Sequence, residues 1–141
     1  MDDARTVRRQ TRSGKIGRGA IGILQRDGRY LLIRRASGVP RGGAWCFPGG
    51  HVDPGECSRV AVVRELGEEL SLIVEATEKL GHVRVPEFGY VLAVWRVRWV
   101  GGTIIPAPAE VAEVRWCTGA EMRALEPSLA SNQVVFGMLG A

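Results

Sequence analysis

The stretch from Gly49 to Leu72 constrains the fold of this chain more than any other, because it joins a glycine-rich turn to an amphipathic helix. At about 100° per residue, apolar side chains group on one side of a helix that ends near Leu70, and carboxylates occupy an arc of roughly 100° on the opposite side. The apolar side consists of Val60, Val62, Val63, Leu66 and Leu70, and the acidic side consists of Glu65, Glu68 and Glu69. We therefore expect a helix that buries one face and presents three carboxylates from the other.

The three clustered carboxylates have two interpretations. Like charges within one helical turn repel, and without compensation each raises the pKa of its neighbours. A solvated acidic face is the common outcome for a glutamate-rich helix surface. The alternative is a site for a hard divalent cation, which prefers oxygen ligands and cancels the repulsion. The residues around the helix favour this second interpretation.

The spacing around the helix is the strongest functional signal in the sequence. From Gly50 it runs through five residues to Glu56, through seven residues to Arg64-Glu65-Leu66, and then through one residue to Glu68-Glu69 and one more to Ser71-Leu72. This pattern resembles the Nudix box of the Nudix hydrolases, which cleave nucleoside diphosphates linked to another group. Ser71 is the one departure, because the family has glycine there. A serine at this point must either accept the strain of a positive φ or end the helix differently.

The resemblance implies attack of water on a pyrophosphate with the help of a metal ion. Bound Mg²⁺, for which Mn²⁺ can substitute, polarises phosphoryl oxygens and lowers the pKa of a coordinated water. Glu56 and Arg64 would pair to hold the loop against the helix, a role that suits a planar and permanently charged guanidinium. The implied metal ligands are Glu65, Glu69, the carbonyl oxygen of Gly49 and, directly or through a metal-bound water, Glu68.

Four residues outside the box are candidates for the site, and most have a structural alternative. Arg35 closes a predicted strand, where it is either a solvated edge charge or, as in MutT-type members, a contact to substrate phosphate or base. Trp45 precedes the box and either packs or touches a base. Glu110 lies where a family glutamate often reaches the metals. Asn132 belongs to a segment, residues 131–135, that resembles the base-binding segment of MutT-type enzymes; its amide can read a purine edge or cap the last helix.

Three residues of the loop before the helix receive structural interpretations. His51 lies where the family varies widely, so we expect its side chain to be exposed and not to be a ligand. Cys57 occupies the usual position of a Ser or Thr helix cap, and Ser58 can cap one residue later.

The remaining segments predict strands with helices on both sides of a sheet. Asp27-Gly28 between two apolar runs is a good signal for a hairpin turn, and Gly101-Gly102 is expected to turn the chain. The predicted strands are Ile16–Leu24, Arg29–Arg35, Ile73–Val85, Gly89–Val100 and Val111–Cys117, and the later helices are Gly119–Leu125 and Asn132–Leu139. We expect an α/β fold, a Nudix-type α/β/α sandwich around a mixed β-sheet.

Length and composition bound the class of protein. With 141 residues, 45% of them hydrophobic, the chain fits one globular domain, which we assign to residues 16–141 after a basic, unstructured tail at residues 1–15. No apolar run approaches the ~20 residues of a membrane span, and the basic N-terminus lacks the apolar segment of a signal peptide. Three cysteines without metal-ligand spacing are typical of reduced thiols. We therefore expect a cytoplasmic protein.

The basic charge is concentrated near the N-terminus. A pI of about 9.4 fits nucleic-acid binding, but six basic residues lie between Arg5 and Arg18 with no aromatic residue among them. A stacking platform is therefore not indicated, and we do not expect nucleic acid to be the main partner. The expected partner is a small nucleotide substrate, with no membrane; a homodimer is left open.

The function that follows is Mg²⁺-dependent hydrolysis of a nucleoside diphosphate derivative, foremost a nucleoside triphosphate, oxidised or not. ADP-ribose or another nucleotide sugar is the enzymatic alternative, and Pro86 and Tyr90, which point to different subfamilies, do not decide between them. A catalytically idle Nudix module that binds nucleotide is a further alternative. The complete set of box residues argues against idleness.

Overall fold

The computed structural model describes residues 17–86 and 89–140, and the predicted tail at residues 1–15 lies outside them. The strands in the described part are β1 (Gly17–Arg26), β2 (Arg29–Arg35), β3 (Trp45–Cys46), β4 (Gly49–His51), β5 (Leu72–Val85), β6 (Tyr90–Gly102) and β7 (Val111–Cys117). The helices are α2 (Ser58–Leu70), α3 (Gly119–Ala124) and α4 (Asn132–Leu139).

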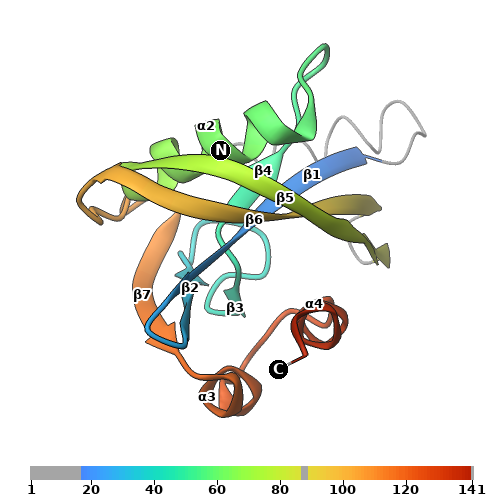
Figure 1. The fold of residues 1–141 in the computed structure, drawn as a ribbon. Helices are drawn as coiled ribbons and strands as arrows, with labels where there is room; N and C mark the ends of the chain where they lie inside the picture. The colour runs from blue at the N-terminus through green and yellow to red at the C-terminus, as the bar shows by residue number, and fades with distance from the viewer. Residues whose placement is uncertain (1–16, 87–88, 141) are drawn as a thin grey trace.

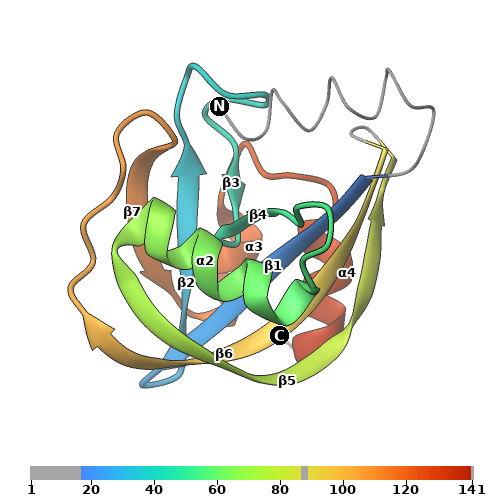
Figure 2. The same cartoon turned by 90° about the horizontal axis from the view of Figure 1, so that it is seen from above.

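Strand β1 is the centre of a mixed sheet. It runs parallel to β6, with Gly17 opposite Tyr90 and Leu24 opposite Val97, and antiparallel to β2 and β4. The strand order is β3-β2-β1-β6-β5, with β4 paired to β1 and β7 paired to β2. Helix α2 lies on one side of this sheet, and α3 and α4 lie on the other (Figures 1 and 2). The expected α/β/α sandwich around a mixed sheet is confirmed.

The core occupies both sides of the sheet because successive residues of a strand point to opposite faces. On β1, Ala20 and Leu24 pack toward α2, whereas Ile21 and Ile23 pack toward α3 and α4. Leu66 of α2 is fully buried, and burial of such a side chain stabilises the fold by about 1.5–3 kcal/mol. No helix in the described part of the chain is long and apolar enough to cross a membrane.

The two glycine turn signals of the sequence have different outcomes. Asp27 and Gly28 form the β1–β2 turn with φ values of 52° and 76°, the conformation of a two-residue hairpin. Gly101-Gly102 does not turn the chain, so that prediction was wrong. Both glycines continue β6 and pair with the beginning of β5. A side chain at Gly102 would collide with the Ser71 carbonyl oxygen, so this glycine permits a close approach of two strands.

The ends of α2 differ from the usual caps. Cys57 is the N-cap residue without a side-chain hydrogen bond, and the Ser58 hydroxyl instead accepts a hydrogen bond of 2.9 Å from the Trp95 indole. Cys57 therefore occupies the cap position that the sequence indicated, and the alternative cap at Ser58 was wrong. At the other end, Ser71 adopts the left-handed conformation, with φ 60° and ψ 26°. The serine thus accepts the strain that the family glycine avoids.

Candidate functional site

Strand β4 brings two glycines against the middle of α2. The Gly49 N–H donates a 2.9 Å hydrogen bond to Glu69 Oε1. A Cβ on Gly50 would collide with the carboxylate of Glu65, and a Cβ on Gly49 would collide with the Ala20 carbonyl of β1. Because glycine has no side chain, β4 can lie against β1 and the two carboxylates at once.

The carboxylates of α2 are not equally exposed, which corrects the expected acidic face. Glu65 is 1% exposed and Glu69 is 8% exposed, whereas the side chain of Glu68 is 46% exposed. The expected apolar side was also wrong at Val60, which is 55% exposed. The reason is that α2 is covered on two sides, by β1 and by β4, so its buried arc is turned toward Glu65 and Glu69.

Arg64 is the centre of a group of hydrogen bonds at this position. Its guanidinium binds both oxygens of Glu56, at 2.8 and 2.9 Å, a two-pronged geometry that is stronger than a single neutral bond. It also donates to Glu65 Oε2 at 2.9 Å and to the His51 carbonyl at 3.0 Å, and lies 3.2 Å from Glu68 Oε2. The bond from Arg64 lowers the pKa of Glu56, and the same bond raises the pKa of Arg64. Loop and helix are thus tied together.

His51 is buried at 1% exposure, so the expectation of an exposed side chain was wrong. The cause is that His51 belongs to strand β4 and pairs with Gly19 of β1 instead of lying in an open loop. Its Nε2 lies 2.7 Å from Asp53 Oδ1, and the Asp53 N–H donates to Glu56 Oε1 at 3.0 Å. This pair had no signal in the sequence beyond the spacing of the two residues.

Two of the expected ligand side chains, Glu65 and Glu69, fit a site for a hard divalent cation. Glu65 and Glu69 place buried carboxylate oxygens beside the glycine backbone of β4, which is the oxygen set that Mg²⁺ prefers. Glu68 instead lies close to Arg64, on the exposed side of the helix. Within residues 17–86 and 89–140, no three Asp, Glu, His or Cys side chains gather closely enough to hold a metal ion. The fit therefore rests on Glu65, Glu69 and backbone oxygen.

A pocket begins at the same two glycines and extends away from α2. It encloses about 620 Å³, including open space at its mouth, and Gly49 and Gly50 form part of its wall. Its other polar residues come from distant parts of the chain, namely Arg35, Tyr90, Ser131 and Asn132, and apolar walls come from Ile21, Phe47, Val85, Leu92 and Leu129. Phe47 packs edge-on against Phe136, with ring centroids 6.0 Å apart.

Asn132 and Arg35, both predicted site residues, are fixed in the pocket wall. The Asn132 amide is 2% exposed and donates a 3.0 Å hydrogen bond to the Trp45 carbonyl. Ser131, not Asn132, is the N-cap residue of α4, so the capping alternative for Asn132 was wrong. Arg35 is half-buried and donates at 2.7 Å to the Pro40 carbonyl, which anchors its guanidinium to the loop after β2.

Trp45 and Glu110 lie beside the pocket and the helix end. The Trp45 ring is 4% exposed, lies under the Arg115 guanidinium at 4.9 Å, and does not line the pocket. Glu110 ends a loop that is hydrogen-bonded to the end of α2, through Ala107 N–H to the Glu69 carbonyl at 2.8 Å, and its own carbonyl accepts from Ala36 at 3.0 Å. The Glu110 segment is therefore hydrogen-bonded both to the C-terminal end of α2 and to the chain directly after β2.

Several pocket residues escaped the sequence reasoning. Phe47 and Cys46 line the pocket, yet each reads in the sequence as an ordinary residue of a strand or its flank. Tyr90 also lines the pocket, whereas in the sequence it was only an ambiguous marker of the substrate class. The one available signal was the position of Phe47 directly before Pro48-Gly49, which joins it to the box.

Comparisons with known proteins agree with this arrangement. The NUDIX domain family model matches residues 15–136. A CTP pyrophosphohydrolase from Escherichia coli is 36% identical over 114 residues, covering 79% of this chain and 82% of that protein. An ADP-ribose pyrophosphatase from Methanocaldococcus jannaschii is 41% identical over 66 residues, 47% of this chain and 38% of that protein.

A solved structure has the same fold over most of the chain. The crystal structure of a MutT protein from Methanosarcina mazei superposes with a TM-score of 0.80 at 22% identity, covering 89% of this chain and 94% of that one. With the family match over residues 15–136, and the box residues gathered around Arg64, this chain belongs to the NUDIX domain family of Nudix hydrolases.

Proposed function

We propose that this chain hydrolyses the pyrophosphate linkage of a small nucleoside diphosphate derivative, foremost a nucleoside triphosphate, with Mg²⁺ as its metal and Mn²⁺ able to substitute. One observation carries the proposal: Gly49 and Gly50 belong both to the carboxylate group of α2 and to the wall of the pocket. A nucleotide whose base enters the pocket has its phosphates beside Glu65 and Glu69. Gly49 and Gly50 would thus belong both to the substrate-binding part and to the catalytic part of the site.

The pocket residues would bind the nucleoside. Phe47 and the apolar wall offer a surface for a base, which gains from leaving water. One amide hydrogen of Asn132 is engaged by the Trp45 carbonyl, which fixes the orientation of the amide and leaves a carbonyl oxygen and a second hydrogen to read a base edge. Arg35 would balance phosphate charge. Trp45 contributes through its backbone, as the support of Asn132.

The residues of α2 and β4 would position the reaction. Glu65, Glu69 and the Gly49 carbonyl are the proposed metal ligands, with Glu68 as a further ligand or a contact to metal-bound water, and Glu110 as a candidate from its loop. When bound, the metal polarises phosphoryl oxygens and makes a coordinated water a better nucleophile. Arg64 holds Glu65 at 2.9 Å, and Glu56 holds Arg64, so Glu65 is oriented before substrate arrives.

A nucleotide sugar is the second candidate substrate. The likeness to an ADP-ribose pyrophosphatase, 41% identity over 66 residues, favours it. We place the reaction in the cytoplasm, where the free thiols of Cys46, Cys57 and Cys117 stay reduced.

A substrate panel tests the proposal. Nucleoside triphosphates and ADP-ribose are incubated with the full chain and millimolar Mg²⁺, and phosphate, pyrophosphate and nucleoside monophosphate are measured, with Glu69→Gln as the inactive control. We expect a nucleoside triphosphate to be cleaved with the highest kcat/KM. A higher kcat/KM for ADP-ribose would replace the substrate. Nucleotide binding without hydrolysis of any compound would identify an idle module.

A further inference from the structure

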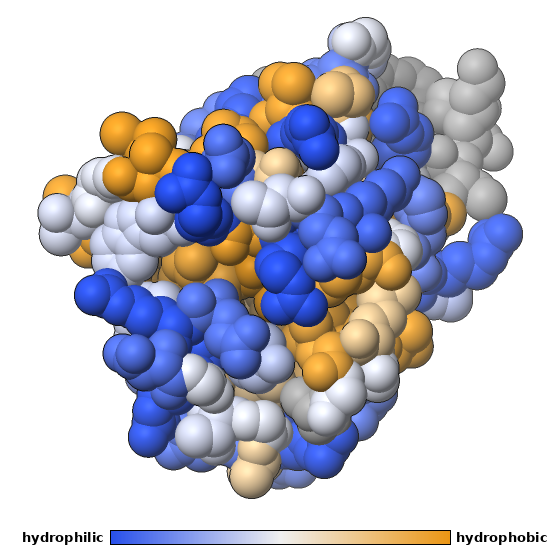
Figure 3. Space-filling view, in the orientation of Figure 1, coloured by the Kyte–Doolittle hydropathy of each residue, from blue (hydrophilic) through white to orange (hydrophobic). Residues whose placement is uncertain are grey.

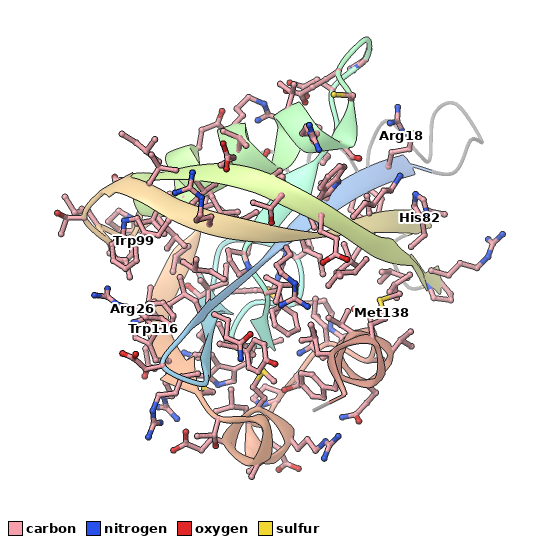
Figure 4. All side chains as sticks on the ribbon, in the orientation of Figure 1. Arg18, Arg26, His82, Trp99, Trp116 and Met138 are labelled. Atoms are coloured by element: carbon pink, nitrogen blue, oxygen red, sulfur yellow. The ribbon has the colours of Figure 1, made fainter. Side chains whose placement is uncertain are left out.

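An exposed basic face lies on the α2 side of the sheet, beyond the N-terminal end of α2. Figure 4 shows two of its members, Arg18 and His82, together at the end of the sheet where β1 begins. Its residues are Arg18 of β1, Arg59 of α2, and Lys79, His82 and Arg84 of β5, and all five side chains are exposed. We call these five residues the basic face.

The strand register places these residues on one side of the sheet. Val91 of β6 pairs with Arg18 of β1 on one side and with Arg84 of β5 on the other. The two arginines are therefore two strand spacings apart, roughly 10 Å. In the same way His82 pairs with Ala93, and Lys79 pairs with Trp95. Paired residues project to the same face, and Ala93 and Trp95 belong to the core under α2. Residues distant in sequence are therefore gathered on one surface.

The basic face differs in its ion pairs from the other side of the same strands. In the described part of the chain, none of its five side chains forms an ion pair. On the opposite face of the same two strands, Arg96 pairs with Glu78 at 3.5 Å and Arg98 pairs with Glu75 at 3.0 Å. One side of the β5–β6 pair is thus neutralised and the other remains positive.

The shape of the face selects an extended polyanion. From Lys79 to Arg84 the strand covers roughly 16 Å, which exceeds the reach of a single phosphate group. The Trp95 ring is 8% exposed and lies under the Arg59 guanidinium at 5.1 Å, so it is not available for stacking on bases. Contacts would therefore be made to phosphates, without sequence preference.

A membrane surface fits the face less well. Binding to a bilayer needs an apolar face as well as cations, and Val60 is the exposed apolar neighbour of Arg59. The exposed side chains of Ile73, Val100 and Ile105 belong to the other end of the β5–β6 pair, where apolar surface gathers at the left of Figure 3. Cations and apolar side chains are thus at opposite ends.

We propose that the basic face binds the sugar-phosphate backbone of single-stranded nucleic acid. A single strand is flexible enough to follow the twist of neighbouring strands while its phosphates contact the cations in turn. The surface is distinct from the pocket, because Val85, Tyr90 and Leu92 line the pocket while Arg84 and Val91 point to the opposite face.

Binding is measured by the fluorescence anisotropy of a labelled 12-nucleotide RNA with the full chain in excess chelator, which separates binding from hydrolysis. The test variant is Arg18→Glu with Arg84→Glu. The control is Arg98→Glu with Arg123→Glu, which changes the net charge equally at exposed positions elsewhere.

We expect the affinity of the wild type for RNA to fall as the salt concentration rises, with a log–log slope of about −3, which corresponds to roughly four phosphate contacts. The test variant should bind about 10-fold or more weakly, with a shallower slope, and the control should bind within about 2-fold of wild type.

Each other outcome overturns the assignment. Equal losses in both double variants would show that net charge alone attracts RNA, and no loss in the test variant would move binding to the tail. Binding of a poly-glutamate peptide, or of phosphatidylserine-containing vesicles, as tight as RNA would identify an acidic protein or a membrane as the partner. Circular dichroism checks folding, and Arg18→Ala with Arg84→Ala replaces the test variant if it does not fold. The kcat/KM for small nucleotides should be the same in the wild type and in both double variants. If none of the three proteins hydrolyses nucleotide, the proposed function is contradicted, but the proposed binding of nucleic acid is not.

Discussion

The two walls of the candidate site are built in opposite ways. The carboxylate wall, consisting of Gly49, Glu56, Arg64, Glu65 and Glu69, comes from one short stretch and is joined by hydrogen bonds of 2.8–2.9 Å. The pocket wall, consisting of Arg35, Phe47, Tyr90 and Asn132, is collected from the whole chain. The difference separates two properties: changes in the first wall should affect the reaction itself, and changes in the second should affect which nucleotide reacts.

The largest effect is expected at the carboxylate wall from Glu69→Gln. The amide oxygen can still accept the hydrogen bond from Gly49, so the fold should stay intact, but a charged oxygen ligand is lost. We expect kcat to fall by at least about 100-fold, equivalent to about 2.7 kcal/mol, with the circular dichroism spectrum unchanged. Millimolar Mg²⁺ should raise the Tm of the wild type by mass action. Full nucleotide hydrolysis in excess chelator would contradict the role of the wall.

A smaller effect is expected at the pocket wall from Asn132→Ala. An unmatched polar group on a bound base costs about 1–3 kcal/mol, so kcat/KM for the preferred nucleotide should fall by about 5-fold to 150-fold, mainly through KM. The ratios of kcat/KM among different bases should move toward unity. The exposed neighbour Gln133→Ala is the matched control and should leave these ratios unchanged. If Asn132→Ala lowers the Tm but keeps the ratios, the amide only supports Trp45.

The charge of the carboxylate wall predicts an acid-dependent stability. Arg64 depresses the pKa of Glu56 in the folded state below its ordinary value of 4.5. Because the pKa of Glu56 is lower in the folded protein than in the unfolded chain, its ionised carboxylate stabilises the fold fully at a pH above the unfolded pKa. This stabilisation is lost as the pH falls through the folded pKa. The wild type should therefore lose more unfolding free energy than Glu56→Gln between about pH 5 and pH 3. Urea unfolding at several pH values measures this; parallel curves for the two proteins would mean that Glu56 and Arg64 are not coupled.

The smallest effect is expected where the carboxylate wall ends, from Ser71→Gly. At φ 60° a serine carries strain of about 1 kcal/mol, partly offset by the greater freedom of glycine in the unfolded chain. The weak bond from Ser71 Oγ to the Ile105 carbonyl, at 3.4 Å, would also be lost. We expect a gain in unfolding free energy of at most about 1 kcal/mol and a kcat within about 2-fold of wild type. A large gain in kcat would show that Ser71 misplaces Glu69.

The same contrast explains how far sequence reasoning could go. The spacing from Glu56 to Glu69 lies within one loop and one helix, so it could be matched to the Nudix box, and that resemblance implied the pair of Glu56 with Arg64. The burial of Glu65 and Glu69 could not be anticipated, because a helical wheel does not contain β4, which covers that side of α2. The burial of His51 could not either, because the sequence did not predict that it belongs to β4. The bond from Asn132 to Trp45 joins residues 87 positions apart, and no local pattern encodes it.

The parallel pairing of β1 with β6 has a consequence for how the molecule folds. Gly17 meets Tyr90, so the central strand pair closes a long loop of chain, and such non-local pairing is slow to form. The whole carboxylate wall lies within that loop, whereas Tyr90 and Leu92 reach the pocket only when β6 docks on β1. During synthesis from the N-terminus, the residues of the carboxylate wall are therefore made before the strand that completes the pocket.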